Sequence, residues 1–322
     1  MTALHEGDLL DYYRIEKLVA RSGMASIYKA TDTRDGRAVA IKIPHPEMEA
    51  DPLLFDRFKR EREIGQKLDH PGVMKVYPDE KHSRVYMAME WVDGHLLRDD
   101  MNGKPLPTER AVNITARVCD ALDYIHANGV VHRDLKPENI MVDDDDNIKL
   151  IDFGIAGSEG SRRLTFAQLS NVMGTPDYIS PEQVKGKRGD GRSDIYAIGV
   201  MLYEMLTGKV PFSGPNPFAT MNERLLNNPV PPRELDPKIS PELQEIIYRA
   251  IERDPKNRYA HAREFSQDLR HQDQVGVAAD RLELKDWRER KSGWPRKVLN
   301  YAALALIPIV IFSLLLWVAK RA

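Results

Sequence analysis

The residue types best suited to chemistry lie in two short segments near the middle of the chain. The first reads HRDLKPEN at 132–139 and the second reads DFG at 152–154. Together they supply a carboxylate, a cation two positions later, an amide five positions later, and a second carboxylate further on. Phosphoryl transfer needs such parts, because a carboxylate can accept a hydroxyl proton, a cation can neutralise a γ-phosphate, and hard oxygen atoms bind Mg²⁺.

A further cation lies in a strand-like run, VAIK at 39–42. Alternation along a strand places Ala40 and Lys42 on one face, so a small side chain lies beside a cation, as a flat base next to a phosphate would require. Upstream, residues 19–28 read as strand, tight turn and strand built from small residues, which let backbone N–H groups approach phosphate oxygens. Taken alone, this segment fits an ordinary β-hairpin equally well.

The elements that must position these residues change type once along the chain. Short β-like runs separated by turn signals dominate residues 12–90, and one helix over about 52–68 interrupts them. From Thr108 onward helical patterns prevail, beginning with a helix that an Asn128-Gly129 pair should end. The sequence therefore predicts a small β-rich lobe with one helix, followed by a larger α-helical lobe.

Taken together and in order, these motifs resemble the protein-kinase superfamily, and the resemblance spans a domain at 12–270. The residues around Gly23, Ser180 and Tyr203 are most similar to those of bacterial eukaryotic-like serine/threonine kinases. The resemblance implies an α+β, bilobal kinase fold that uses ATP and Mg²⁺. It also implies transfer of the γ-phosphate to Ser or Thr hydroxyls of protein substrates, with autophosphorylation; Lys136 and Thr175 favour Ser/Thr over Tyr.

The same resemblance assigns roles to the catalytic segments. Asp134 would be the catalytic base that orients the substrate hydroxyl, and Lys136 would neutralise the γ-phosphate. Asn139 and Asp152 would hold Mg²⁺.

It also assigns the nucleotide-binding positions. Lys42 would bind the α- and β-phosphates and pair with a glutamate of the first helix, for which Glu61 is the candidate and Glu63 a solvated competitor. Met89 resembles the gatekeeper residue. The remaining positions form the phosphate turn, the hinge and the walls around adenine: Val19, Ala20, Ser22, Gly23, Met24, Ala25, Ile27, Ala40, Glu90, Val92 and Met141.

Residues beyond the DFG segment resemble an activation segment and its supports. Gly174-Thr175 and Ser180-Pro181-Glu182 resemble its end, with Ser180 in place of the more usual Ala. Arg258 matches the arginine that pairs with Glu182 inside the larger lobe. Asp194 resembles the aspartate that opens a buried helix and holds the catalytic loop by hydrogen bonds.

Two departures from the family pattern leave a second function class open. Ala20, Ser22 and Ala25 replace three expected glycines, so we expect the phosphate turn to lose freedom at positive φ and ATP affinity to fall. Ala167 and Leu169 lie near the positions of an activating threonine pair, although Thr165 and Ser170 are nearby acceptors. A catalytically weak pseudokinase, acting as a membrane-tethered scaffold, is therefore the alternative to an active kinase.

Composition excludes several other classes of protein. With 47 Lys plus Arg against 49 Asp plus Glu, the formal net charge is −2, so we expect no nucleic-acid partner. The 42% hydrophobic and 30% charged residues are typical of a folded globular protein. The single cysteine, Cys119, excludes a disulfide framework and indicates a reducing compartment.

The C-terminal part of the sequence indicates a membrane anchor. Residues 298–319 carry no charge and, at ~1.5 Å per residue, could cross the ~30 Å hydrocarbon core, although a buried C-terminal helix is the alternative. From Arg281 to Lys297 there are seven Lys or Arg against three acids. Because positive flanks stay in the cytoplasm, we expect a basic juxtamembrane linker at 271–297 and one transmembrane helix at 298–319, which anchors a cytoplasmic kinase domain to the cell membrane. The lipid bilayer would be one partner, and a second copy in a kinase homodimer another.

Overall fold

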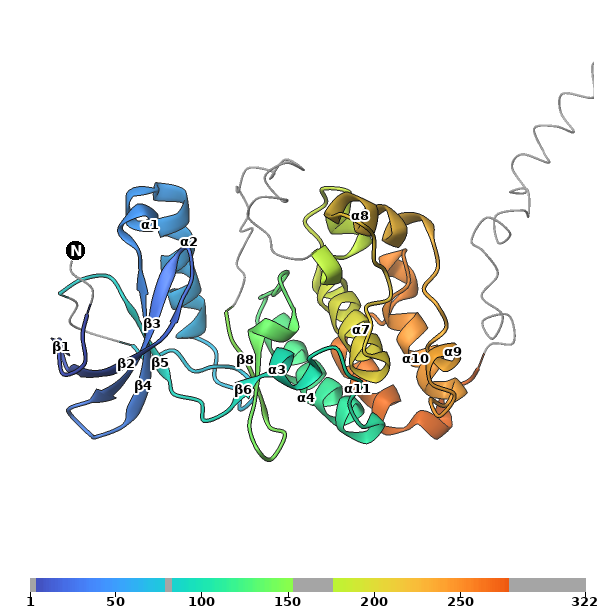
Figure 1. Cartoon of the computed structure of the whole chain (residues 1–322), viewed down its shortest axis with the longest axis horizontal. Helices are drawn as coiled ribbons and strands as arrows, with labels where there is room; N and C mark the ends of the chain where they lie inside the picture. Colours follow the sequence, from blue (N-terminus) through green and yellow to red (C-terminus); the bar gives the residue numbers. More distant parts are fainter. Residues whose placement is uncertain (1–3, 79–82, 153–175, 278–322) are drawn as a thin grey trace, which may run out of the picture.

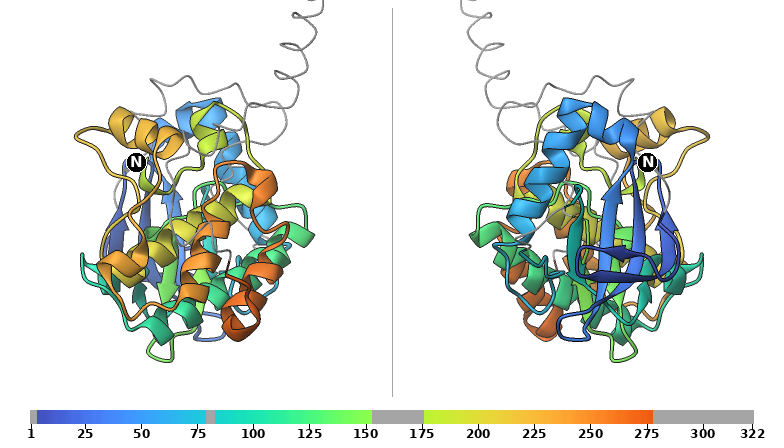
Figure 2. Two further views of the ribbon diagram at one scale, coloured as in Figure 1. Left: turned by 90° about the vertical axis from the view of Figure 1, so that its right-hand side faces the viewer. Right: turned by 90° about the vertical axis from the view of Figure 1, so that its left-hand side faces the viewer.

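The computed structural model describes residues 4–78, 83–152 and 176–277, which fold into two lobes (Figure 1). Strands dominate the lobe that carries the N-terminus, whereas helices dominate the other lobe. The two views of Figure 2 show the twisted sheet lying behind the helices from one side and in front of them from the other. The α+β bilobal fold predicted from the sequence is therefore confirmed.

The small lobe is built on a five-stranded antiparallel sheet with strand order β1-β2-β3-β4-β5. Its core is formed by alternate strand residues such as Tyr13, Ile15, Val39 and Ile41, all almost fully buried. Two irregularities interrupt the pairing of β2 with β3, between Ile15 and Lys17 and between Leu18 and Ala20. The strands are β1 Leu9–Leu10, β2 Tyr13–Arg21, β3 Ala25–Asp32, β4 Ala38–Pro44 and β5 Met87–Glu90.

The helical part of this lobe differs from the single helix that the sequence predicted. A short helix α1 (Pro46–Ala50) precedes α2 (Pro52–Gly65). Asp51 separates them with φ −92° and ψ 109°, because a residue before proline is pushed out of the helical region. One of the β-like runs within 12–90, at residues 73–77, forms only isolated bridges, in which Val73 pairs with Leu150 and Val76 with Met89.

The large lobe is organised around two long helices, α4 (Thr108–Ala127) and α7 (Gly191–Thr207). As predicted, α4 ends at Asn128-Gly129, where Gly129 has φ 73°. The side chain of Asp190 caps α7 by accepting from the Arg192 amide at 2.9 Å. The helix therefore begins three residues before Asp194, which lies in its first turn and does not open it. The other helices are α3 Leu97–Met101, α6 Pro181–Val184, α8 Pro217–Leu226, α9 Pro232–Leu235, α10 Pro241–Ala250 and α11 Ala262–Arg270.

A small three-stranded sheet and four 3₁₀ turns complete the lobe and place its loops. The sheet has the order β6-β7-β8 and carries the segment that follows HRDLKPEN. Its strands are β6 His95–Leu96, β7 Ile140–Val142 and β8 Ile148–Leu150, and the 3₁₀ turns are η1 Pro137–Asn139, η2 Pro176–Tyr178, η3 Pro255–Asn257 and η4 Gln272–Gln274.

Across the three described stretches, none of the helices combines the length and the apolar character needed to cross a membrane. The predicted transmembrane segment 298–319 lies outside the described residues, as does the linker beyond residue 277.

Candidate active site

A lysine held between two carboxylates connects the two lobes. Lys42 of β4 donates to Glu61 Oε1 of α2 at 2.9 Å and to Asp152 Oδ1 at 2.5 Å. Glu63, the competing glutamate, is exposed on the same helix. The pairing of Lys42 with Glu61 predicted from the sequence is therefore confirmed.

The charges around Lys42 and Asp152 shift the pKa values of both side chains in the direction that keeps each of them ionised. Burial lowers the pKa of Lys42, but the charges of Glu61 and Asp152 outweigh burial and raise that pKa above its usual value. Burial raises the pKa of Asp152, yet Lys42 outweighs this too, and the net pKa lies below the usual range of a carboxyl. Near neutral pH, therefore, Lys42 is a cation and Asp152 a carboxylate.

The catalytic segment folds into a compact loop that ends in η1. Lys136 Nζ lies 3.1 Å from Asp134 Oδ2, and Asn139 Nδ2 donates to the backbone carbonyl of Asp134 at 2.7 Å. The carboxylate and the cation expected to act together are thus adjacent. Because the Asn139 nitrogen is used within the loop, its side-chain oxygen is the atom left for a ligand.

Asp194 of α7 anchors the residues just before Asp134. This side chain is 1% exposed and accepts from the backbone amides of His132 at 2.9 Å and Arg133 at 2.7 Å. His126 Nε2 lies 2.8 Å from the same carboxylate. Arg133 has φ 64°, a conformation that an L-residue adopts only when its surroundings hold it. The predicted anchoring role of Asp194 is confirmed.

One cleft, with a volume of about 850 Å³, opens on the large lobe along the catalytic segment. Asp134, Lys136, Asn139 and Asp152 all face it, together with residues of η2 and α8. The carboxylate of Asp152 and the amide oxygen of Asn139 are hard donors of the kind that Mg²⁺ binds, with substrate phosphates and water completing its shell. The residues present therefore fit a Mg²⁺–nucleotide complex.

The phosphate turn is organised by the side chain of Ser22 and does not need positive φ at the replaced glycine positions, while the expected fall in ATP affinity stays a prediction. Ser22 Oγ accepts from the amides of Met24 at 3.2 Å and Ala25 at 3.1 Å. None of the residues 20–25 has a positive φ, so alanine and serine are not strained there. A Cβ added to Gly23 would meet nothing within 4 Å, which leaves the turn open above.

Strand register brings together most of the residues expected around the nucleotide. Ala20 pairs with Ile27 and Ile27 with Lys42, so these three side chains share one face of the sheet. Ala40 pairs with Met89, which is 3% exposed. Met89, the expected gatekeeper, and the small side chain of Ala40 therefore lie on the same face as Lys42.

The other expected adenine positions lie on neighbouring elements. Val19 is 46% exposed within the irregular part of β2, and Val92 is half-buried just after β5. Met141 lies in β7, opposite Leu96 and Lys149. The side chain of Glu90 pairs with Lys149 at 2.7 Å, and its backbone N–H donates to the Lys75 carbonyl at 2.9 Å.

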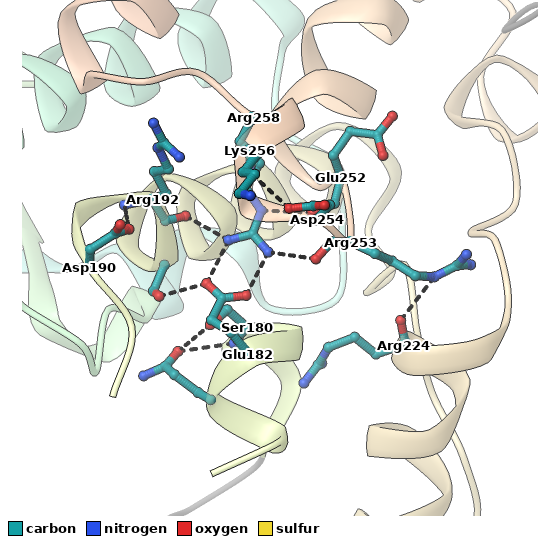
Figure 3. Close-up of polar contacts among 12 residues, drawn as sticks. Ser180, Glu182, Asp190, Arg192, Arg224, Glu252, Arg253, Asp254, Lys256 and Arg258 are labelled. Carbon is teal, nitrogen blue, oxygen red and sulfur yellow. Dashed lines mark hydrogen bonds and ion pairs between the residues drawn. The ribbon is translucent and has the colours of Figure 1, made fainter. Parts of the chain in front are cut away.

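Behind the cleft, a buried ion pair fixes the segment that carries Ser180, as Figure 3 shows. Arg258 donates to both carboxylate oxygens of Glu182 at 2.7 Å, and Ser193 Oγ donates to Glu182 at 2.7 Å. Side-chain exposure is 0% for Arg258 and 8% for Glu182. This confirms the predicted pair.

Sequence reasoning missed a charged cluster on the wall of the cleft. Arg98 of α3 donates to Glu138 at 2.9 Å and to Glu204 of α7 at 2.9 Å. The Tyr178 hydroxyl bonds both Arg98 and Glu204. Glu204 is 106 positions from Arg98, and no spacing rule could have paired them.

The predicted activation-segment residues lie outside the described residues. These are the acceptors Thr165, Ser170 and Thr175, and the two replaced positions Ala167 and Leu169.

Comparison with known proteins agrees with this geometry. The chain matches the protein kinase domain over residues 13–272. It is 40% identical over 263 residues to a probable serine/threonine-protein kinase of Streptomyces coelicolor, covering 80% of this chain and 39% of that protein. It is 37% identical over 267 residues to the serine/threonine-protein kinase PknB of Mycolicibacterium smegmatis, covering 81% and 43%. The chain thus spans about two fifths of the length of these curated relatives.

Comparison with solved structures also matches the chain to a protein kinase domain. The PknI kinase domain of Mycobacterium tuberculosis superposes with a TM-score of 0.65 at 27% identity, covering 84% of this chain and 100% of that one. With a domain match over most of its length, this chain belongs to the protein kinase family.

Proposed function

We propose that the chain is an active serine/threonine protein kinase that transfers the γ-phosphate of ATP to Ser or Thr hydroxyls of proteins. The observation that carries this proposal is the Lys42 ion pair with Glu61 and Asp152, because Asp152 lines the same cleft as Asp134. A scaffold that only docks partners would not need all these groups in place.

In this proposal the residues of the catalytic segment act on the substrate hydroxyl and the transferred phosphate, and the others hold the nucleotide and its metal ion. Asp134 accepts the proton of the substrate hydroxyl and orients it, while Lys136 neutralises charge on the transferred group. Lys42 positions the α- and β-phosphates, and Asn139 and Asp152 hold Mg²⁺. When bound, Mg²⁺ would supply positive charge that neutralises the charge developing on the phosphates.

The choice of Ser or Thr as acceptor rests on the relatives and on one residue of the loop. The relatives from Streptomyces and Mycolicibacterium are named as serine/threonine kinases. Lys136, beside Asp134 at 3.1 Å, is typical of that group.

A transfer assay on purified residues 1–297 tests the function. Radiolabelled ATP, Mg²⁺ and a degenerate peptide library with Ser, Thr or Tyr acceptors should give label on Ser and Thr, and the chain itself should also be labelled. Asp134→Asn should abolish this label yet keep the melting temperature, since the change removes only the base. Equal labelling by Asp134→Asn, or none by wild type with Mg²⁺ or Mn²⁺, would favour the scaffold alternative.

We further propose that residues 298–319 anchor the kinase in the cell membrane as a single-pass helix, with the kinase domain in the cytoplasm. Support comes from the charge-free span and the linker before it, whose seven basic and three acidic residues between 281 and 297 suit an anionic lipid surface. Two anchored copies would share one membrane plane, and their raised local concentration would favour a homodimer and autophosphorylation between copies.

Cell fractionation tests the anchor. The full chain should sediment with membranes and resist carbonate extraction, whereas a chain ending at residue 297 should become soluble. If both versions partition identically, residues 298–319 are not an anchor.

A further inference from the structure

Ser180, which replaces the usual alanine, makes hydrogen bonds at the start of helix α6. Ser180 is the N-cap of α6, and its backbone amide and hydroxyl both donate to Gln183 Oε1, at 3.0 Å and 2.8 Å. Ser180 is 0% exposed, so these bonds form without competition from water.

The other end of the Gln183 amide reaches the catalytic loop. Gln183 Nε2 donates to the backbone carbonyl of Arg133 at 2.9 Å, across 50 positions of sequence. The orientation of this amide is unambiguous, because the Ser180 N–H can only donate and the Arg133 carbonyl can only accept. Its oxygen must therefore face Ser180 and its nitrogen Arg133.

Arg133 is the residue directly before the catalytic base, and both sides of its backbone are held. Its amide donates to Asp194 at 2.7 Å, while its carbonyl receives the bond from Gln183. Its φ of 64° is a conformation that costs energy and persists only where neighbours determine it. Without the Gln183 bond, the peptide group between Arg133 and Asp134 loses this restraint and the direction of Asp134 is less defined.

We propose that Gln183, oriented by Ser180, is a positioning residue for the catalytic base, an inference that rests on the proposed kinase function. It connects the helix beneath the substrate side of the cleft to the loop that carries Asp134. Gln183 also lines the cleft, so a bound acceptor peptide would lie close to this connection.

Two substitutions separate this role from simple helix capping. Gln183→Glu keeps an oxygen for Ser180 and a negative charge that suits a helix start, so α6 should stay capped. Its second oxygen, however, faces the Arg133 carbonyl, where two acceptors repel. Gln183→Met keeps the length of the side chain and loses all three bonds, two from Ser180 and one to Arg133. Gln267→Glu, an exposed position on α11, is the matched control.

Steady-state kinetics and hydrogen exchange on the full chain test the proposal. Gln183→Glu should lower kcat about tenfold or more and change KM for ATP less than twofold. Its melting temperature should stay within about 2 °C of wild type, because α6 stays capped. Ser180→Ala should lower kcat about threefold and add nothing in the Gln183→Met background. Without nucleotide, amides of residues 131–139 should exchange faster in Gln183→Glu than in wild type or Gln267→Glu.

The outcomes separate this inference from the proposed function. If wild type transfers no phosphate, the function fails, and the exchange comparison still decides the restraint on the loop. If wild type is active while Gln183→Glu keeps its kcat and loop exchange, Gln183 only caps a helix and the inference is wrong.

Discussion

The buried pair of Glu182 and Arg258 allows a sharp prediction about stability. Arg258 makes two bonds to Glu182 at 2.7 Å and further bonds to backbone carbonyls of Arg192 at 2.9 Å and Glu252 at 2.7 Å. Arg258→Met removes all of them and leaves Glu182, only 8% exposed, with Ser193 as its remaining side-chain donor. Breaking a buried pair from one side costs about 3–5 kcal/mol.

Urea unfolding followed by fluorescence measures this cost directly. A loss of 3–5 kcal/mol corresponds to a drop in melting temperature of roughly 6–20 °C for a domain of this size. The double variant Glu182→Met/Arg258→Met should recover part of the loss, because no unpaired charge stays buried. If Arg258→Met costs less than about 1 kcal/mol, or if the double variant costs the sum of the two single changes, the reasoning is refuted.

The pH dependence of this loss has a defined sign. Burial raises the pKa of Glu182, but Arg258 outweighs burial and the net pKa lies below its usual value. A carboxyl with a depressed pKa stabilises the fold above its unfolded pKa and loses that contribution as pH falls through the folded value. The difference between wild type and Arg258→Met should therefore be full at pH 7 and shrink below about pH 4.5.

Three further predictions concern activity. Glu61→Gln should lower kcat/KM at least tenfold in transfer assays, since Lys42 loses a charge-assisted bond of 2.9 Å; activity within twofold of wild type would contradict this. Ser22→Gly should raise KM for ATP about two- to fivefold, because the hydroxyl that orders the turn is lost; a lowered KM would instead favour steric crowding by Cβ atoms. Arg224→Met should raise KM for peptide and leave KM for ATP unchanged. This fully buried arginine donates to the backbone carbonyls of Pro176 and Asp177, at 2.6 and 2.5 Å, on the wall of the cleft. Equal effects on both KM values would instead indicate that the substitution loosens the whole domain.

Much of the fold could be predicted because local signals agreed with the tertiary contacts. Alternation marked the strands β2, β3 and β4, and the Asn128-Gly129 pair marked the end of α4. The expected helix over about 52–68 is present as α2, which also begins at Pro52, whereas the short helix α1 before it was not predicted. The capping box from Ser180 to Gln183 was also readable, but its link to Arg133 was not.

By itself, the sequence determined which groups are available for chemistry and their order along the chain. Asp134, Lys136 and Asn139 lie within one short segment, so their closeness to one another follows from their spacing. Only the tertiary structure decided how distant residues combine, as for Gln183 with Arg133 across 50 positions, Asp194 with His126 across 68, and Arg98 with Glu204 across 106. The spacing of residues along the chain predicts contacts within one turn or one strand. Contacts between elements depend on how their buried faces pack, so a buried polar group pairs with a distant residue only once the elements have packed together.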